Sequence, residues 1–410
     1  MRARAIVVSA VVSAATAALA LAGCGGGHRT PEPARAPAIG ITEANPALVW
    51  AARDRPAEAA PFARARRKLA ALRPAYYRLM ISWAGVQPRP DAPPDWGILD
   101  PGCERATPPC APFAGVREQL RAVRSAQRAQ PGGWQVVVNF LYTPAWAARG
   151  PGGCEPGRVD PTSRQIAPGA LPAYRAMVRS LAQLGRSEGV ELRYWSAWNE
   201  PNYRGFASPQ RASCGAGSAS VAPAYYGGLV RQLRTALAGV PGRHDVLLGE
   251  VSDAPASGPK ATSAVDFARG LPRDVVCSSD LWAQHVYVGD PDTVPAVEAA
   301  LDARGCGRRH RVWITETGVG GPRAGGPRPT DPASLRAQCR ELDGLLGRWH
   351  REPRVRAAFQ YSFREDDLFP VGLVDPRLAR VYQPYDAWAA WARRPRPGDP
   401  APALPGTCRA

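Results

Sequence analysis

The sequence is poor in lysine, histidine and long apolar runs, and each scarcity excludes a class of protein. All but two of the 52 basic residues are arginine, because Lys68 and Lys260 are the only lysines among 410 residues. The arginines are spread along the chain without a helix-turn-helix, zinc-knuckle or RNA-binding signature. The net charge of +17 therefore reflects arginine-rich composition, and no nucleic-acid partner is expected. Attraction to acidic envelope polymers is a weaker alternative.

Only five histidines are present, and the nine cysteines lack the short paired spacings with histidine that metal sites use. We therefore expect neither a metal nor another cofactor. Only one long apolar run exists, at the N-terminus, which excludes a multi-pass membrane protein. Hydrophobic residues still make up 45% of the chain, so a protein of this length can bury a large core.

The N-terminus has the pattern of an export signal. Two arginines precede the apolar stretch Ala5–Ala20, which is too short to span a membrane comfortably. The next residues, Leu21-Ala22-Gly23-Cys24, resemble the lipobox of bacterial lipoproteins, in which the cysteine thiol accepts a lipid. The resemblance implies a signal over 1–23, a lipid anchor at Cys24, a flexible tether over 24–37 and an extracytoplasmic location on the bacterial cell membrane. An ordinary signal peptide or an uncleaved anchor is the alternative.

The remaining cysteines are even in number, which in an exported chain predicts up to four disulfides. They are Cys103, Cys110, Cys154, Cys214, Cys277, Cys306, Cys339 and Cys408. Cys103 and Cys110 flank a proline-rich loop and form a plausible local pair, whereas the sequence leaves the other pairings open. Residues 395–410 are predicted to be an extended tail, which Cys408 can hold in place.

Beyond residue 37, short apolar runs alternate with helical stretches rich in alanine, leucine and arginine. The predicted strands are Ala38–Thr42, Tyr76–Ser82, Trp134–Leu141, Leu192–Trp198, Asp245–Gly249, Leu281–Val286, Arg311–Thr315 and Ala357–Ser362. The predicted helices are Pro61–Ala71, Ala114–Gln130, Leu171–Glu188, Ala222–Leu237, Ala261–Gly270, Val294–Ala303, Pro332–Trp349 and Pro384–Trp391.

Eight strand–helix units predict the α/β class and a single (β/α)8 TIM barrel over residues 38–394, with long loops after the second, third and fourth strands. The alternative is a doubly wound open sheet, but no glycine-rich phosphate turn follows the first strand. No internal repeat or linker divides the segment, and we expect a monomer.

Functional side chains of such a barrel lie at the C-terminal ends of its strands. Two segments are the most informative there, the stretch YWSAWNEPN at 194–202 after the fourth strand and VWITETG at 312–318 after the seventh. The polar and aromatic residues at the strand ends are Glu43, Arg78, Asn139, Asn199, Glu200, Glu250, His285, Tyr287, Glu316, Tyr361 and Phe363.

This pattern resembles clan A of the retaining glycoside hydrolases, most closely the branch around families 39 and 5. In that clan an Asn-Glu pair ends the fourth strand and supplies the acid/base, while a glutamate ending the seventh strand is the nucleophile. The resemblance implies that Glu200 is the acid/base and Glu316 the nucleophile of an enzyme that cleaves a carbohydrate substrate. Matches extend over residues 38–391, including TPAW at 143–146 for the loop after the third strand.

The same resemblance gives roles to neighbouring residues. Arg78 matches the second-strand arginine that supports the nucleophile, and Tyr287 of the His285-Val286-Tyr287 element could orient the same carboxylate. Asn199 would hydrogen-bond the sugar 2-hydroxyl, an interaction that strengthens in the transition state. For His285, a buried structural histidine is the alternative.

Other strand-end residues are less specific. Trp83, Trp146 and Trp198 offer flat faces for sugar rings, although packing in the barrel is equally expected of them. Glu43 and Glu250 are expected to be exposed loop acids rather than subsite contacts. Asp366 and Asp367 are expected in a solvated loop.

Two departures from the clan pattern leave the identity of the sugar undetermined. Tyr361 and Phe363 stand where the clan has a tryptophan at the eighth strand, and Asn139 and Tyr142 stand where a second histidine is usual. The alternative function is a catalytically silent barrel that binds envelope glycan. The presence of both glutamates together with Arg78 and Asn199 argues against this alternative, because a protein that only binds glycan does not need these four residues together.

Overall fold

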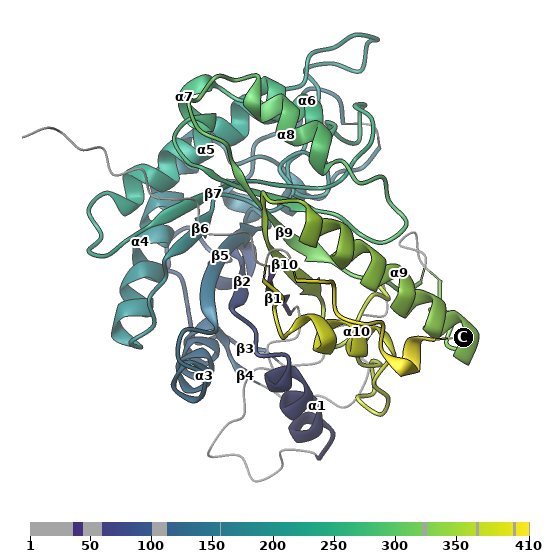
Figure 1. The fold of residues 1–410 in the computed structure, drawn as a ribbon. Coiled ribbons are helices and arrows are strands. Elements are labelled where there is room, and N and C mark those ends of the chain that lie inside the picture. The colour runs from purple at the N-terminus through teal and green to yellow at the C-terminus, as the bar shows by residue number, and fades with distance from the viewer. Residues whose placement is uncertain are drawn as a thin grey trace, which may run out of the picture. The chain divides into compact units, whose positions relative to one another are not determined.

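A computed structural model describes residues 36–43, 60–100, 113–155, 157–321, 326–365, 369–396 and 399–409. Eight parallel strands close into a barrel in the order β1-β10-β9-β8-β7-β6-β5-β2 (Figure 1). They are β1 (Ala38–Thr42), β2 (Tyr76–Ser82), β5 (Gln135–Leu141), β6 (Tyr194–Ser196), β7 (Asp245–Val251), β8 (Leu281–His285), β9 (Arg311–Thr317) and β10 (Val355–Tyr361). The predicted (β/α)8 barrel is confirmed, and every strand boundary falls within two residues of its prediction.

Helices follow the strands and lie outside the ring (Figure 1). They are α1 (Ala60–Ala71), α2 (Trp83–Val86), α3 (Gly115–Ala129), α4 (Leu171–Ser187), α5 (Ala222–Leu237), α6 (Ala264–Gly270), α7 (Arg273–Val276), α8 (Val294–Asp302), α9 (Pro332–Arg351) and α10 (Pro384–Trp391). α6 begins three residues later than predicted because Ser263 caps it, accepting a hydrogen bond from the Asp266 amide. The short α2 and α7 were not predicted, and neither was the antiparallel pair β3 (Leu99–Asp100) and β4 (Phe113–Ala114).

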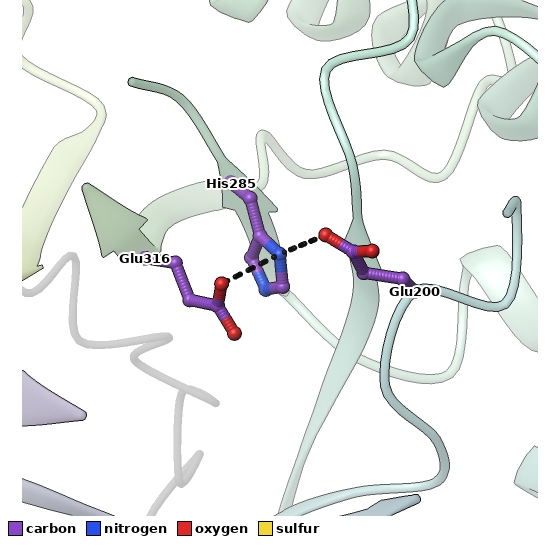
Figure 2. Close-up of side chains that lie close together, drawn as sticks. All are labelled: Glu200, His285 and Glu316. Carbon is purple, nitrogen blue, oxygen red and sulfur yellow. Dashed lines mark hydrogen bonds and ion pairs between the residues drawn. The ribbon is translucent and has the colours of Figure 1, made fainter. Parts of the chain in front are cut away.

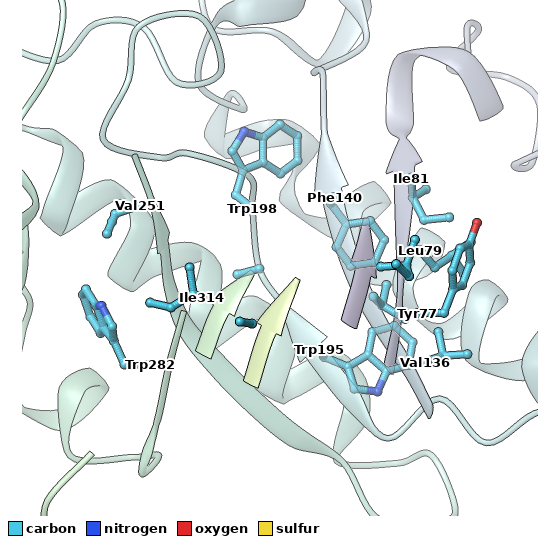
Figure 3. Packing of buried hydrophobic residues seen from close by; sticks show 14 of the residues in the cluster. Tyr77, Leu79, Ile81, Val136, Phe140, Trp195, Trp198, Val251, Trp282 and Ile314 are labelled. Atoms are coloured by element: carbon cyan, nitrogen blue, oxygen red, sulfur yellow. The ribbon is translucent and has the colours of Figure 1, made fainter. Parts of the chain in front are cut away.

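Alternation along β2 shows how the sequence builds two faces of one sheet. Tyr77, Leu79 and Ile81 are buried between the strands and the surrounding helices (Figure 3). Tyr76 and Arg78 alternate with these residues and face the inside of the barrel, because successive side chains of a strand point to opposite faces. One strand therefore contributes both to the dry layer beneath the helices and to the barrel interior.

The interior of the barrel begins with an aromatic layer near the N-terminal ends of the strands. The Trp313 ring lies 4.4 Å from that of Tyr76 and 4.9 Å from that of Tyr194, measured between centroids. Phe359 closes the layer against β1, where a Cβ on Gly40 would lie 2.2 Å from the Phe359 ring. The first strand therefore needs a glycine at this position, and the layer fills the barrel as a packed core.

Three disulfides join Cys154 to Cys214, Cys277 to Cys306 and Cys339 to Cys408. The last fixes the tail to α9, as expected for Cys408. Cys24, Cys103, Cys110, Asp366 and Asp367 lie outside the described residues, as do the predicted signal and nearly all of the tether. Among the residues described, no helix is long and apolar enough to cross a membrane.

Candidate active site

The ends of β6 and β7 have an unusual backbone that holds two glutamates. The φ angles of Glu200 and Glu250 are 36° and 54°, in a left-handed region that residues other than glycine rarely adopt. The two ends are joined because the Glu200 amide donates to the Glu250 carbonyl over 2.9 Å. Asn202 strengthens the junction, donating to the Thr262 carbonyl and accepting from the Ser252 amide. The surrounding hydrogen bonds thus maintain a conformation that the backbone disfavours.

Arg78 on β2 binds three strand-end side chains from the inside of the barrel. Its Nη1 donates to Glu316 Oε1 over 2.7 Å, and its Nη2 donates to Glu250 Oε2 over 2.8 Å and to Asn199 Oδ1 over 2.6 Å. Arg78 and Glu250 are completely buried. A buried guanidinium needs such compensation, because removing its charge from water is costly unless it is paired.

Glu316 on β9 is held from two sides. Arg78 contacts one carboxylate oxygen, and the Tyr287 hydroxyl donates to the other, Oε2, over 2.7 Å. The side chain of Glu316 is 8% exposed. Both oxygens are therefore oriented by donors, while a small part of the side chain stays exposed. This is the arrangement expected of a carboxylate that must attack in a fixed direction.

His285, the last residue of β8, lies between the carboxylates (Figure 2). Its Nδ1 is 2.8 Å from Glu200 Oε1 and 3.4 Å from Glu316 Oε2. Its Nε2 is 3.1 Å from Glu250 Oε2. His285 is 1% exposed, so it fits the buried histidine named as the alternative, but its contacts are the candidate catalytic groups themselves.

The charges in this cluster shift the pKa values in opposite directions. Burial lowers the pKa of His285, but the charge of Glu316 and the hydrogen bonds to Glu200 and Glu250 outweigh burial and raise it to about 10. Burial raises the pKa of Glu200, and the nearby Glu316 adds to the increase, while His285 opposes it. For Glu250, burial also favours a raised pKa, but Arg78 and His285 outweigh it and bring the pKa below its usual range. The pKa of Glu200 is thus raised while that of Glu250 is lowered, which is the separation expected between a proton donor and an ionised carboxylate.

Glu200, His285 and Glu316 also have the spacing of a metal site. One potential ligand atom from each lies within 4.8 Å of the others. The donor set fits a metal poorly, however, because both ring nitrogens of His285 lie at carboxylate oxygens and a cationic ring has no lone pair to offer. The positive charge at the centre of these carboxylates is the imidazolium itself.

The three tryptophans near the strand ends differ from one another in burial. Trp83 and Trp198 are completely buried, so of the two roles left open for them the structure shows packing in the barrel. Trp198 donates its ring N–H to the Phe206 carbonyl, and Trp83 packs edge-on against Trp146 at 5.5 Å. Trp146 is only partly buried and keeps some exposed surface.

The expectation of exposed loop acids is wrong. Glu43 is 3% exposed, and its Oε2 accepts hydrogen bonds from the amides of Phe363 and Arg364. Glu43 thus ties β1 to the loop that follows β10. Glu250 is 0% exposed and lies at the centre of the polar cluster. Both are buried because each has donors that satisfy its charge, a property that position along a strand does not reveal.

The remaining predicted positions are arranged around the cluster. Tyr361 is partly buried, and its ring lies 5.5 Å from that of Phe369, which in turn packs against Tyr287 at 5.1 Å. Asn139 is buried on β5, and Tyr142, which follows that strand, is 38% exposed and stacks on Phe206. The structure therefore brings together Arg78, Asn199, Glu200, His285, Tyr287 and Glu316, with Tyr361 beside them. Two more residues belong to this cluster, Glu250 and Thr315, and the Thr315 hydroxyl donates a hydrogen bond to Glu250.

No family model matches the sequence, and no curated protein matches it. Solved structures do share the fold. The endo-β-1,6-glucanase BT3312 has a TM-score of 0.56 and 11% identity, with 88% of this chain and 77% of that one covered. A family 30 endoxylanase from Clostridium papyrosolvens has a TM-score of 0.53 and 11% identity, covering 88% and 72%. A family 5 protein from Streptomyces cattleya, solved with GlcNAc, has a TM-score of 0.51 and 16% identity, covering 90% and 82%.

The chain therefore shares its barrel fold with these three proteins. The resemblance first given by Glu200, Glu316 and their neighbours is thus matched by whole-barrel likeness at very low sequence identity. Such likeness concerns the fold, and the chemistry has to be argued from the residues of this chain.

Proposed function

We propose that the chain is a glycoside hydrolase that cleaves O-glycosidic bonds of an oligo- or polysaccharide with retention of configuration, using Glu200 as acid/base and Glu316 as nucleophile. The observation that carries the proposal is the pairing of these two side chains across the open end of the barrel. An oxygen of each lies within 4.8 Å of the other and of a His285 nitrogen. Retaining enzymes keep their carboxyl groups about 5–5.5 Å apart, whereas inverting enzymes leave room for a water molecule.

In the first step, a Glu316 oxygen attacks the anomeric carbon as the bond to the leaving oxygen breaks. Glu200 transfers its proton to that oxygen, which departs as an alcohol. Arg78 and Tyr287 orient the Glu316 carboxylate for the attack. The raised pKa of Glu200 keeps the proton available before the bond breaks.

In the second step, water attacks the anomeric carbon and gives a proton to Glu200, while the bond to Glu316 breaks. The ester formed in the first step has removed the charge of Glu316, so one cause of the raised pKa of Glu200 is gone. Glu200 is then ionised and can act as a base. Two displacements on the same carbon restore its original configuration.

The proposal is tested with Glu316→Gln after a screen of aryl glycosides and envelope polysaccharides has found a substrate. We expect turnover to fall by more than about 10⁴-fold, because the amide cannot form the glycosyl ester. Product stereochemistry of the wild-type reaction, followed by NMR, should show retention. Glu341→Gln, on the exposed face of α9, is the matched control and should keep full activity. Equal rates for Glu316→Gln and wild type would rule the assignment out.

We also propose that the enzyme is exported and lipid-anchored at Cys24 outside the cytoplasm of a bacterium. Its support is the lipobox-like sequence and three disulfides, which form in oxidising compartments. Cys24→Ala should move the protein from the membrane fraction to the soluble fraction of a bacterial host and abolish labelling by a fatty-acid analogue. Unchanged labelling in Cys24→Ala would show that the lipid is attached elsewhere, and an unlabelled wild type would show that there is no lipid anchor.

A further inference from the structure

Glu250 is a third carboxylate in the cluster, and the mechanism above gives it no chemical step. Its Oε2 accepts three hydrogen bonds, from Arg78 Nη2 at 2.8 Å, Thr315 Oγ1 at 2.9 Å and His285 Nε2 at 3.1 Å. The side chain is completely buried, whereas that of Glu200 is 16% exposed. Glu250 therefore touches the groups around the reaction centre without facing the open end itself.

We propose that Glu250 is a positioning residue, a permanently ionised carboxylate that keeps His285 doubly protonated and so makes His285 a fixed donor to Glu200. The consequence for turnover rests on the proposed glycosidase function, but the protonation state of His285 does not. Glu250 would thus act on the acid/base through the imidazolium.

The contacts of His285 carry the first step of the argument. A neutral imidazole has one N–H and one lone pair, whereas both nitrogens of His285 lie within 3.1 Å of carboxylate oxygens. In a neutral ring, one nitrogen lone pair would face one of these oxygens at hydrogen-bond distance. With two N–H groups, both contacts become charge-assisted hydrogen bonds.

The charges around the ring carry the second step. Three carboxylates contact His285: Glu200 after β6, Glu250 on β7 and Glu316 on β9. Tyr287 bonds Glu316, Asp253 acts on Glu200 from beyond β7, and Arg78 on β2 is the cation that pairs with Glu250 and Glu316. With Glu200 protonated for catalysis, the carboxylates that still carry charge in contact with His285 are Glu250 and Glu316. Arg78 and an imidazolium balance them, and a neutral ring would leave a net negative charge in a buried site.

The third step concerns the proton that Glu200 donates. A His285 N–H on Glu200 Oε1 occupies that oxygen as an acceptor, which places the acidic proton on Oε2. If Glu250 loses its charge, His285 can lose a proton near neutral pH and keep only the Nε2–H. Its Nδ1 would then accept a hydrogen bond from the Glu200 carboxyl and draw the proton away from the leaving oxygen.

The test is Glu250→Gln in the full-length protein with ¹⁵N-labelled histidine, followed by NMR over pH. Glutamine keeps the size and one acceptor oxygen but removes the charge. The chain has five histidines, so the His285 signal can be assigned as the one missing from His285→Asn. We expect the pKa of His285, about 10 in the wild type, to fall by about 1 to 3 units.

Glu43→Gln is the matched control, because Glu43 is also a buried strand-end glutamate but bonds only backbone amides of the β10 loop among the contacts described above. It should leave the titration of His285 unchanged. If Glu250→Gln does not fold, the wild-type titration decides: His285 must stay protonated through neutral pH. A wild-type titration near the ordinary value of 6.5 overturns the proposal.

A kinetic measurement separates positioning from a structural role. For a substrate with a poor leaving group, Glu250→Gln should move the alkaline limb of the kcat/KM profile to lower pH, while an aryl glycoside with an activated leaving group is much less affected. Parallel profiles for folded Glu250→Gln and wild type, with an unmoved His285 titration, would overturn the inference. A shifted titration in a protein that hydrolyses no glycoside would support it and contradict the proposed function.

Discussion

The two ends of the barrel interior differ although the same strands build both. Near the N-terminal ends of the strands, aromatic and aliphatic side chains fill the interior. Two residues further along five of the strands, where the next side chain faces inward, the interior becomes polar or charged. The pairs of successive inward residues are Tyr76 and Arg78 on β2, Val137 and Asn139 on β5, Tyr194 and Ser196 on β6, Ala283 and His285 on β8, Trp313 and Thr315 on β9.

This difference separates stability from chemistry. The apolar side chains at one end need no hydrogen-bonding partners, and their burial away from water stabilises the folded state. The polar end must match each buried charge with another, as Arg78 does for Glu250 and Glu316. Replacing a residue at one end should therefore change unfolding, and replacing one at the other should change turnover or its pH dependence.

The largest effect is expected at the polar end. Glu200→Gln should slow hydrolysis of substrates with poor leaving groups by about 10²–10⁴-fold, since the amide has no proton to transfer. An aryl glycoside that needs no acid should form its glycosyl ester at a nearly unchanged rate. The two substrate classes are compared by steady-state and burst kinetics. Equal losses for both classes would show that Glu200 is not the acid.

The next effect is expected at the apolar end. Phe359→Ala should lower the free energy of unfolding by about 3–5 kcal/mol, because it leaves a cavity against Gly40 and Trp313. Denaturant unfolding measures the change, and kcat per folded molecule should stay near wild type at low temperature. An altered pH profile in this variant would mean that the two ends are coupled.

A third effect, again at the polar end, is a pH dependence of stability. The pKa of His285 is raised from 6.5 to about 10 in the folded state, so its contribution to stability is complete below about pH 6.5 and is lost as the pH rises to about 10. Calorimetry should show Tm falling over this range. Phe359→Ala should keep the wild-type slope, whereas His285→Asn should flatten it. A wild-type slope in His285→Asn would assign the titration to other groups.

Much of the fold was predictable because strand and helix periodicity is local. The runs around Tyr76–Ser82 and Arg311–Thr317 showed their strands, and parallel strands place all their C-terminal ends together. Glu200, Glu316 and Arg78 could therefore be named from position and resemblance. Their convergence follows from closure of the barrel, which the alternation of elements predicts.

Other features depend on partners far away in the sequence. Glu250 looked like a loop acid, yet it is buried because Arg78, 172 residues away, and Thr315, 65 residues away, satisfy its charge. Trp83 and Trp198 could have faced a sugar or the core, and only packing against neighbouring elements decides this. One usable signal was present: Glu250 ends a strand directly beside the strand that leads to Glu200.

The direction in which the chain enters the barrel has a consequence for access. Ala36 donates to the Pro395 carbonyl over 3.0 Å, and β1 begins two residues later at the apolar end. The described part of the chain therefore enters the barrel at its apolar end, opposite Glu200 and Glu316. The polar end is left to the loops that follow the strands, and a substrate of the proposed enzyme would meet these loops first.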